Sequence, residues 1–412
     1  MMLRLLYICP LIVLFILAFC PTAFPASAIG PFELANKDST ASLQVQFAAQ
    51  LRADLYTSDD AEDKLTMEAR RIRLSLSGFL ASPELTYKTQ LSFAPNSNEL
   101  LDIYVNYAYC YCMQFRFGQF KVPFTEYRLG SFQNLTLADW SIATRYFGAE
   151  RQMGFAVHNG YRNVYGRGYT FGVFTGVNAR ASHAVGIPVI YGEKISNPSD
   201  LSEKTSKMKF HPELIGKLSY RYKPEGGKFD AGGALSAAWD IDPTDYQDFS
   251  IRLAPEILVT YNRFTVNGLG YFGFVDMHDP SITKLGVTGY LLELKGRVTD
   301  KIDLSARYTK IDIEDFLSAD ARTRAQDIID RASSDYQLYP SPYTETLLAE
   351  ISKQYANAGD LKNIQEFTAG VSYMLIRHHL KWQNDFVLNR EENISDVSED
   401  EIHIRSQFQL VF

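Results

Sequence analysis

The last residues of the chain read Ile402-His403-Ile404-Arg405-Ser406-Gln407-Phe408-Gln409-Leu410-Val411-Phe412. Apolar and polar side chains alternate along them, with one face formed by Ile402, Ile404, Phe408, Leu410 and Phe412 and the other by His403, Arg405, Gln407 and Gln409. Successive side chains of a strand point to opposite faces, so this period of two predicts a β-strand with one apolar face and one polar face.

The same alternation recurs along the chain. Ile302, Leu304, Ala306 and Tyr308 oppose Asp303, Ser305 and Arg307, and Ile72, Leu74 and Leu76 oppose Arg71, Arg73 and Ser75. The pattern predicts about sixteen strands, at 42–52, 66–80, 84–94, 100–108, 112–119, 151–159, 169–177, 210–222, 229–240, 249–261, 264–274, 286–296, 302–312, 364–374, 379–389 and 402–412.

Short and long connections alternate along most of the predicted chain. Short links fall at 81–83, around Cys110, and at 223–227, 262–263, 298–301 and 375–378; longer links fall mostly on the other parity, at 54–64, 120–150, 178–209, 313–363 and 390–401. An even strand number with short turns at one end and long loops at the other is typical of barrels in bacterial outer membranes. A closed barrel also pairs every backbone group, as hydrocarbon requires. The chain is therefore predicted to be all-β, a transmembrane antiparallel up-and-down β-barrel with long outer loops.

The start of the chain predicts secretion. A short positive segment, an apolar run over 5–19 and Ala26-Ser27-Ala28 together predict a signal peptide at 1–28 and a single barrel domain at 29–412. Cys20 offers a lipid-attachment site as an alternative, although Phe19 stands where a lipoprotein peptidase requires a small residue.

Charge and cysteine content exclude several functions. With 41 Lys and Arg against 48 Asp and Glu, the net charge of −7 gives no reason to expect nucleic acid as a partner. Cys110 and Cys112 form either a disulfide or two free thiols at a tight turn, and no His cluster accompanies them, so neither a metal nor another cofactor is predicted. The seven histidines are scattered and no G-x-S-x-G elbow appears, so an enzyme is not expected.

Three segments resemble the phosphate-selective porin O and P family. They are Glu68-Ala69-Arg70-Arg71-Ile72-Arg73, then Leu101-Asp102-Ile103-Tyr104-Val105, and Phe117-Gly118-Gln119-Phe120-Lys121-Val122-Pro123-Phe124. The resemblance implies a sixteen-stranded, usually trimeric channel whose third outer loop folds inward and narrows the pore. The strand count independently makes 120–150 the third outer loop. Since Pro123 cannot donate to a β-ladder, pairing should stop there.

The polar faces contain candidate anion-binding residues of the pore. These are Arg71, Arg73, Lys88, Arg116, Lys121, Arg128, Arg307 and Arg405. Arginine suits oxyanions because its planar fork binds two oxygens. The alternative for each is an ordinary wall charge that is paired with a neighbour such as Asp102.

The prediction is a porin of the Gram-negative outer membrane, embedded in lipid as a homotrimer. It would pass small anions and polar solutes by passive diffusion, with a preference for anions such as phosphate or another oxyanion. The alternatives are a general non-selective porin and a structural or adhesive barrel. A helix is predicted within the long outer loop at 313–363.

Overall fold

A computed structural model describes residues 32–36, 38, 40–58, 63–94, 97–148, 151–175, 212–241, 249–275, 285–314, 361–376, 379–393 and 398–412. Two predictions therefore lie outside the described residues: the signal peptide at 1–28, and the helical loop, for which only the strand residues at its two ends are described. Among the described residues, no helix is long and apolar enough to cross a membrane.

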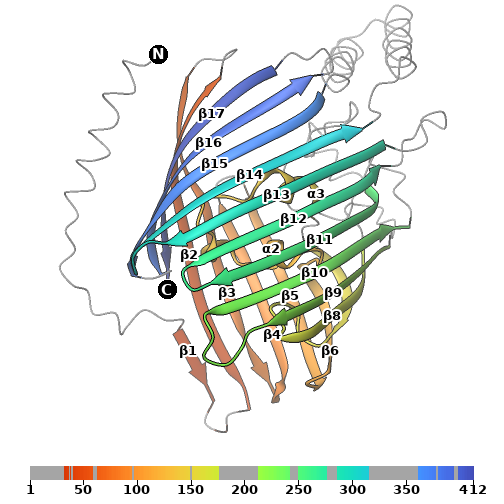
Figure 1. Cartoon of the computed structure of the whole chain (residues 1–412). Helices are drawn as coiled ribbons and strands as arrows, with labels where there is room; N and C mark the ends of the chain where they lie inside the picture. Colours follow the sequence, from red (N-terminus) through yellow and green to blue (C-terminus); the bar gives the residue numbers. More distant parts are fainter. Residues whose placement is uncertain are drawn as a thin grey trace, which may run out of the picture. The chain divides into compact units, whose positions relative to one another are not determined.

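The described chain is a closed antiparallel barrel (Figure 1). Each long strand pairs with the next, and the last pairs with the first from Glu401↔Ser58 to Val411↔Ala48, which closes the sheet. The sixteen strands of the barrel are β2 (Ser42–Ser58), β3 (Lys64–Leu80), β4 (Ser82–Ala94), β5 (Ser97–Cys110), β6 (Met113–Lys121), β7 (Arg151–His158), β8 (Gly166–Phe174), β9 (Glu213–Tyr222), β10 (Phe229–Asp240), β11 (Phe249–Tyr261), β12 (Phe264–Val275), β13 (Leu285–Arg297), β14 (Ile302–Glu314), β15 (Leu361–Ile376), β16 (Leu380–Asn393) and β17 (Ser398–Val411). The predicted fold class and strand number are confirmed.

One short strand was not predicted. β1 (Phe32–Ala35) pairs antiparallel with the start of β2, from Phe32↔Val45 to Ala35↔Ser42. It lies just beyond the end of β17, where Phe412 and Phe47 exchange two backbone hydrogen bonds of 2.7 and 3.0 Å. Four residues are too few for the alternation to distinguish a strand from a loop.

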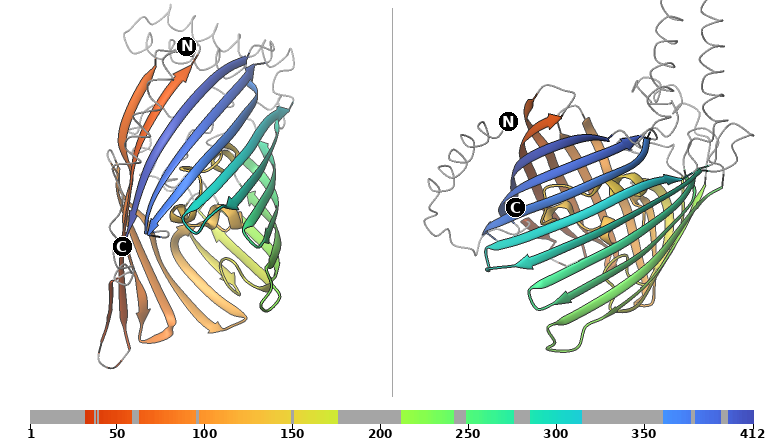
Figure 2. Two further views of the ribbon diagram at one scale, coloured as in Figure 1. Left: turned by 60° about the vertical axis from the view of Figure 1, so that its left-hand side comes forward. Right: turned by 45° about the horizontal axis from the view of Figure 1, so that its top comes forward.

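The two ends of the barrel differ in the connections that they carry. One end, termed the short-turn end, carries the links at Ala81, 111–112, 159–165, 223–228, 262–263 and 298–301 (Figure 2). The other, termed the long-loop end, carries 175–212 and 315–360 and is the end from which 122–150 departs. The predicted parity is confirmed. At the 111–112 turn, Cys110 and Cys112 form a disulfide.

The two faces of the wall separate apolar from polar side chains. Leu304 and Phe408 point outward and are 49% and 40% exposed, whereas Ser305 and Gln407, which are adjacent to them in the chain, point into the barrel and are buried. The outer face therefore suits hydrocarbon, and the inner face holds the charged groups.

A β-bulge interrupts the alternation in β3. Gln50 pairs with Arg71 and Leu51 with Ala69, so Arg70 is the extra, unpaired residue. A bulge re-aims a side chain locally. As a result Arg70 reaches into the barrel beside Arg71, which a strict period of two does not predict.

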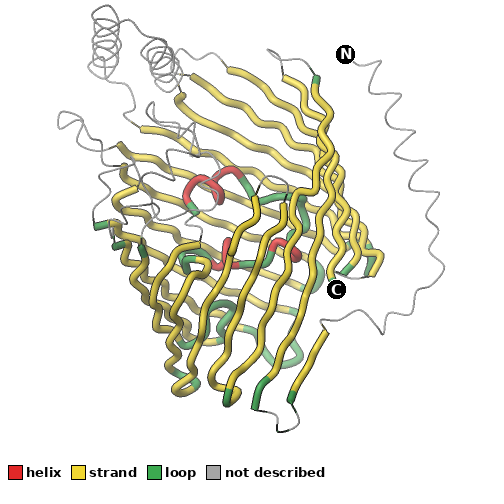
Figure 3. The backbone as a smooth tube through the Cα atoms, turned by 180° about the vertical axis from the view of Figure 1, so that it is seen from behind, coloured by secondary structure: helices red, strands yellow, loops and turns green. Residues whose placement is uncertain are grey.

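The segment 122–148 folds into the barrel rather than away from it (Figure 3). β6 ends at Lys121, two residues before Pro123 as predicted, and the segment carries α2 (Glu126–Leu129), a 3-10 turn (Phe132–Asn134) and α3 (Ile142–Phe147). Thr125 and Ser141 cap the two helices through their side chains. This segment is termed the constriction loop. The predicted range of 120–150 overlapped the end of β6 by two residues.

Gly118 in β6 is predicted to be essential for the wall. Its φ is 128°, and a Cβ there would lie 2.2 Å from the carbonyl oxygen of Ile103. We expect Gly118→Ala to lower the free energy of unfolding by at least about 1 kcal/mol, since a strained backbone conformation alone costs on the order of 1–3 kcal/mol. Urea unfolding in detergent measures this. The control is Gly268→Ala, where the nearest atom is the Ile257 Cγ2 at 3.1 Å; equal losses in both variants would contradict the prediction.

Candidate functional site

The constriction loop is attached to the wall through one buried carboxylate. Asp139 accepts hydrogen bonds from Arg71 on β3 at 2.7 Å, from Arg52 on β2 at 3.1 Å and from Arg70 at 3.3 Å, and its side chain is 4% exposed. From the other side, Arg307 of β14 donates to the Asp139 carbonyl oxygen at 2.9 Å. Charge-assisted hydrogen bonds of this kind are about twice as strong as neutral ones, and burial removes most of the screening by water.

The arginines keep Asp139 ionised. Burial alone would raise the pKa of its carboxyl group, but the charges of Arg71, Arg52 and Arg70 hold that pKa well below its ordinary value of 3.8. The negative charge therefore persists throughout the neutral and mildly acidic range.

Backbone groups of the loop are bound by wall side chains on the far side. Asp385 on β16 accepts the Ala138 amide at 2.5 Å, and Lys381 donates to the Gln133 carbonyl at 2.9 Å. Gln383 donates to the carbonyl of Leu135 at 3.0 Å, and Ser372 of β15 donates to that of Thr136. These bonds satisfy polar groups that would otherwise be buried without partners.

Helix ends and aromatic rings complete the attachment. Glu256 of β11 accepts the backbone amides of Glu126 and Tyr127 at 2.6 and 3.1 Å, which satisfies the first turn of α2. The Phe147 ring is fully buried and stacks on Tyr271 of β12 at a centroid distance of 5.0 Å. Lys217 of β9 donates to Glu126 at 2.7 Å, so the loop is attached to β9 as well as to β2, β3 and β11–β17.

A group of cations occupies the wall between β3 and β7 and the adjoining part of the loop. It is termed the cation cluster and consists of Arg73, Lys88, Arg116, Lys121, Arg128 and Arg151. Asp102 of β5 lies among them, 2.6 Å from Arg151 and 3.9 Å from Lys88. Within the described ranges, Arg73 and Arg116 form no ion pair.

Aromatic rings support several of these cations. The guanidinium of Arg73 lies 4.6 Å from the centroid of Phe132, that of Arg116 lies 3.9 Å from the centroid of Tyr161, and that of Arg128 lies 4.9 Å from the centroid of Trp140. An aromatic face holds a guanidinium in place without using its N–H edges, which stay directed toward other partners.

The predicted site residues fall into two groups. Arg71, Arg307 and Arg405 are paired: Arg71 with Asp139, Arg307 with Glu366 at 3.0 Å, and Arg405 with Asp54 at 3.1 Å. The other five predicted residues come together in the cation cluster, namely Arg73, Lys88, Arg116, Lys121 and Arg128. Lys121 donates to the carbonyl oxygens of Arg128 and Gly130, which fixes the start of the loop.

Four contributors were absent from the predicted site. Arg52 lies on the inward face of β2 and could have been assigned by alternation. Arg151 follows directly after the predicted loop, where the alternation of a strand has only begun. Asp139 carried no signal, since a single acid in a loop is unremarkable, and Arg70 enters the site only because of the bulge. In the described part of the chain, no cluster of His, Cys, Asp or Glu could hold a metal ion.

The comparisons with known proteins agree with this geometry. The barrel is similar to the outer membrane channel DcaP of Acinetobacter baumannii, with 11% identity and a TM-score of 0.57, covering 93% of this chain and 100% of that one. It is also similar to an anion-selective porin from Comamonas acidovorans, with 11% identity and a TM-score of 0.54 over 90% of this chain and 100% of that one. The fold is therefore that of an outer-membrane porin.

Residues 43–209 match the family described as phosphate-selective porin O and P, which confirms the resemblance predicted from the sequence. No curated protein sequence matches the chain significantly. The family match and the barrel support a porin-type channel of the Gram-negative outer membrane, and they indicate a channel rather than an enzyme.

Removal of the Asp139 carboxylate should release the loop. We expect Asp139→Ala to lower the free energy of unfolding by about 3–5 kcal/mol, since it leaves buried arginines without their partner. Urea unfolding in detergent measures the loss, and protease cleavage within 122–148 should appear in the folded barrel. Asp312→Ala is the control: this aspartate pairs with Lys310 with 34% of its side chain exposed, and should change stability by about 1 kcal/mol or less. Equal effects in both variants would contradict the role of Asp139.

The attachment should also resist acid. Because the folded pKa of Asp139 is lowered, its contribution is present above the ordinary value of 3.8 and is lost only as the pH falls through the lower folded value. Hydrogen–deuterium exchange of the Trp140 amide, which donates to the Asp139 carboxylate at 3.0 Å, should therefore show the same protection at pH 7 and pH 4.5 after correction for intrinsic rates. A loss of protection within that range would show that another group controls the loop.

Proposed function

We propose that the protein is a passive diffusion pore for small hydrophilic solutes and ions, with a preference for anions set by the cation cluster. The observation that carries the proposal is the state of Arg73, Lys88 and Arg116. Two of them have no ion pair among the described residues, and the third shares Asp102, at 3.9 Å, with the closer Arg151.

These three cations lie where their charge acts most strongly. The constriction loop narrows the lumen, and Phe132 on that loop lies under Arg73. Asp102 partly offsets the charge of Lys88, and the charges of Arg151, Arg116 and Arg73 act on the same side chain, so an anion that passes meets several neighbouring cations rather than one tight site. Low-dielectric walls focus such a field, and several weak sites favour conduction over trapping.

Much of the remaining charge in the lumen is neutralised in pairs. Examples are Arg252 with Glu213, Lys217 with Glu126 at 2.7 Å, and Arg307 with Glu366 at 3.0 Å. These pairs favour a second candidate, a general porin with little selectivity, if the field of the cation cluster is weak compared with the whole pore. The family match supports phosphate as one of the solutes, and the family resemblance supports a homotrimer as the assembly.

The reversal potential in a planar bilayer under a potassium chloride gradient tests the proposal. The wild-type protein should give discrete conductance steps and an anion-selective potential. Arg73→Gln should lower the permeability ratio of chloride to potassium by at least about twofold, because one unpaired charge leaves the constriction. Arg263→Gln is the matched control, since this arginine lies in the 262–263 turn with 51% of its side chain exposed, and it should leave the ratio unchanged.

The other outcomes have separate meanings. A cation-selective potential in the wild-type protein would retain the pore and refute the anion preference. Absence of conductance from a demonstrably folded barrel would refute the pore itself. Equal effects of the two substitutions would show that the cation cluster does not set selectivity.

A further inference from the structure

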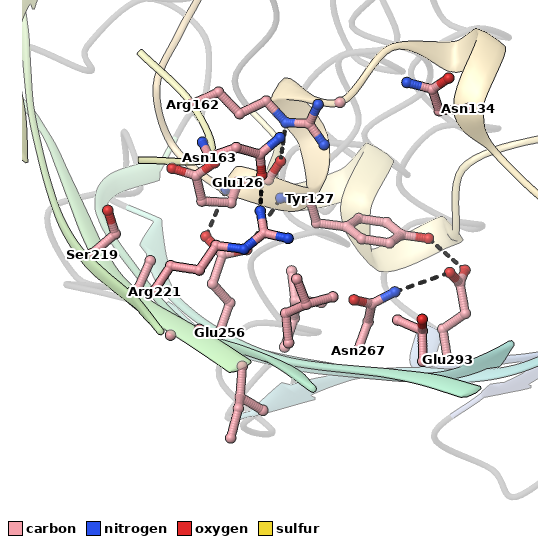
Figure 4. A pocket seen from close by; sticks show the side chains of 18 of the residues that line it. Glu126, Tyr127, Asn134, Arg162, Asn163, Ser219, Arg221, Glu256, Asn267 and Glu293 are labelled. Carbon is pink, nitrogen blue, oxygen red and sulfur yellow. Dashed lines mark hydrogen bonds between the residues drawn. The ribbon is translucent and has the colours of Figure 1, made fainter. Parts of the chain in front are cut away.

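A second feature of the lumen lies between the constriction loop and the wall formed by β9–β13. It is a chamber lined on the loop side by Tyr127, Asn134 and Trp140, and on the wall side by residues in the short-turn halves of the strands (Figure 4). The β7–β8 turn closes one side of it with Arg162 and Asn163. The chamber therefore lies on the short-turn side of the loop.

The wall carboxylates of the chamber already have partners. Both oxygens of Glu256 accept backbone amides of α2. Glu293 accepts the Tyr127 hydroxyl at 2.6 Å and the Asn267 side-chain amide at 3.2 Å (Figure 4). Their acceptor groups are thus used to position the loop, and they are poorly placed to bind a cationic solute.

Glu126 and Arg221, which also line the chamber, have hydrogen-bond partners as well. Glu126 accepts from Lys217 at 2.7 Å and from the Asn163 amide at 3.0 Å. Arg221 donates two bonds of 2.8 Å to Asp230 and a third of 2.8 Å to the Asn163 side chain. The hydrogen-bond donors and acceptors in this part of the chamber therefore satisfy one another.

Arg162 differs from these groups. Its Nε donates to the Glu126 carbonyl oxygen at 3.2 Å, and within the described ranges no carboxylate lies within 4 Å of its guanidinium. The residue is exposed to the lumen, and its two terminal nitrogens have no hydrogen-bond partner among the described residues. A planar guanidinium with two free nitrogens fits a carboxylate in a bidentate manner.

Apolar side chains form a second part of the chamber, termed the apolar wall. It consists of Leu135 and Trp140 from the constriction loop and Leu269 from β12, which are nearly buried, and Gly232 and Gly233 also line the chamber and have no side chains to fill it. Sites of this composition, with apolar walls and a few oriented polar groups, suit organic molecules better than hydrated inorganic ions.

We propose that this chamber is a transient binding site for small organic carboxylates, with the carboxylate on Arg162 and the apolar body against Trp140 and Leu269. The proposal rests on the proposed function and specifies a class of solute for it. Inorganic phosphate would leave the apolar wall unused, and a neutral sugar would leave the Arg162 nitrogens unpaired. A solute that carries both features uses both parts of the chamber.

Saturation-transfer NMR on the folded full-length barrel in detergent tests the proposal with benzoate as the probe. The dissociation constant of benzoate should rise at least about tenfold in Arg162→Gln, as the loss of one charge-assisted pair predicts. Arg162→Lys keeps the charge but loses the bidentate geometry, so its dissociation constant for benzoate should lie between those of wild type and Arg162→Gln. Arg167→Gln is the matched control, because this arginine is exposed at the same end of the barrel and does not line the chamber; its dissociation constant should stay within about twofold of wild type. These variants are compared in one detergent, so partition of benzoate into micelles cancels.

This readout is independent of conduction. If the wild-type reversal potential shows no anion preference but benzoate binding depends on Arg162, the proposed selectivity is refuted and the proposed carboxylate site is supported. If the pore is anion-selective but benzoate binds equally to wild type and Arg162→Gln, or does not bind, the chamber proposal is overturned. Displacement of benzoate by equimolar phosphate would also overturn it, since the apolar wall would then contribute nothing.

Discussion

The structure depends on one buried carboxylate. Asp139 places a single negative charge among Arg52, Arg70 and Arg71, and this contact fixes a loop of more than twenty residues across the lumen. A buried charge without partners would cost several kcal/mol, so neither the acid nor the arginines are stable there alone. The mutual requirement makes the loop part of the barrel interior rather than a mobile surface segment. It also uses the charges of Arg52 and Arg71, whose side chains are 5% and 11% exposed, to hold the loop.

The barrel therefore divides its charges between two tasks. Paired groups such as Arg252 with Glu213 and Arg405 with Asp54 hold the loop and the wall together. Arg73 and Arg116 instead rest on aromatic rings, which hold a guanidinium without neutralising it. The outer face has no such requirement, because closure of the sheet between β17 and β2 satisfies the backbone and leaves apolar side chains for the lipid.

The sequence predicted the parts of this arrangement that follow from local geometry. The period of two assigned the faces of β3, β14 and β17, and Pro123 located the end of β6. The partners of the arginines could not be predicted. Arg71 and Asp139 are 68 residues apart, and the local pattern of neither segment indicates that the two residues meet in the fold. The same limit explains Arg70, whose inward direction follows from a register shift between two strands. Local alternation thus predicted which residues face the lumen, whereas only the folded loop distinguishes a structural arginine from one that meets solutes.

The proposed anion preference requires that Arg73 and Arg116, which form no ion pair among the described residues, present positive charge to the lumen. Anomalous diffraction from crystals grown in rubidium bromide tests it most directly, since both ions are located in one measurement. We expect bromide near Arg73 and Lys88 and no rubidium between the constriction loop and β3–β6. Rubidium at that position, with bromide absent, would refute the anion preference.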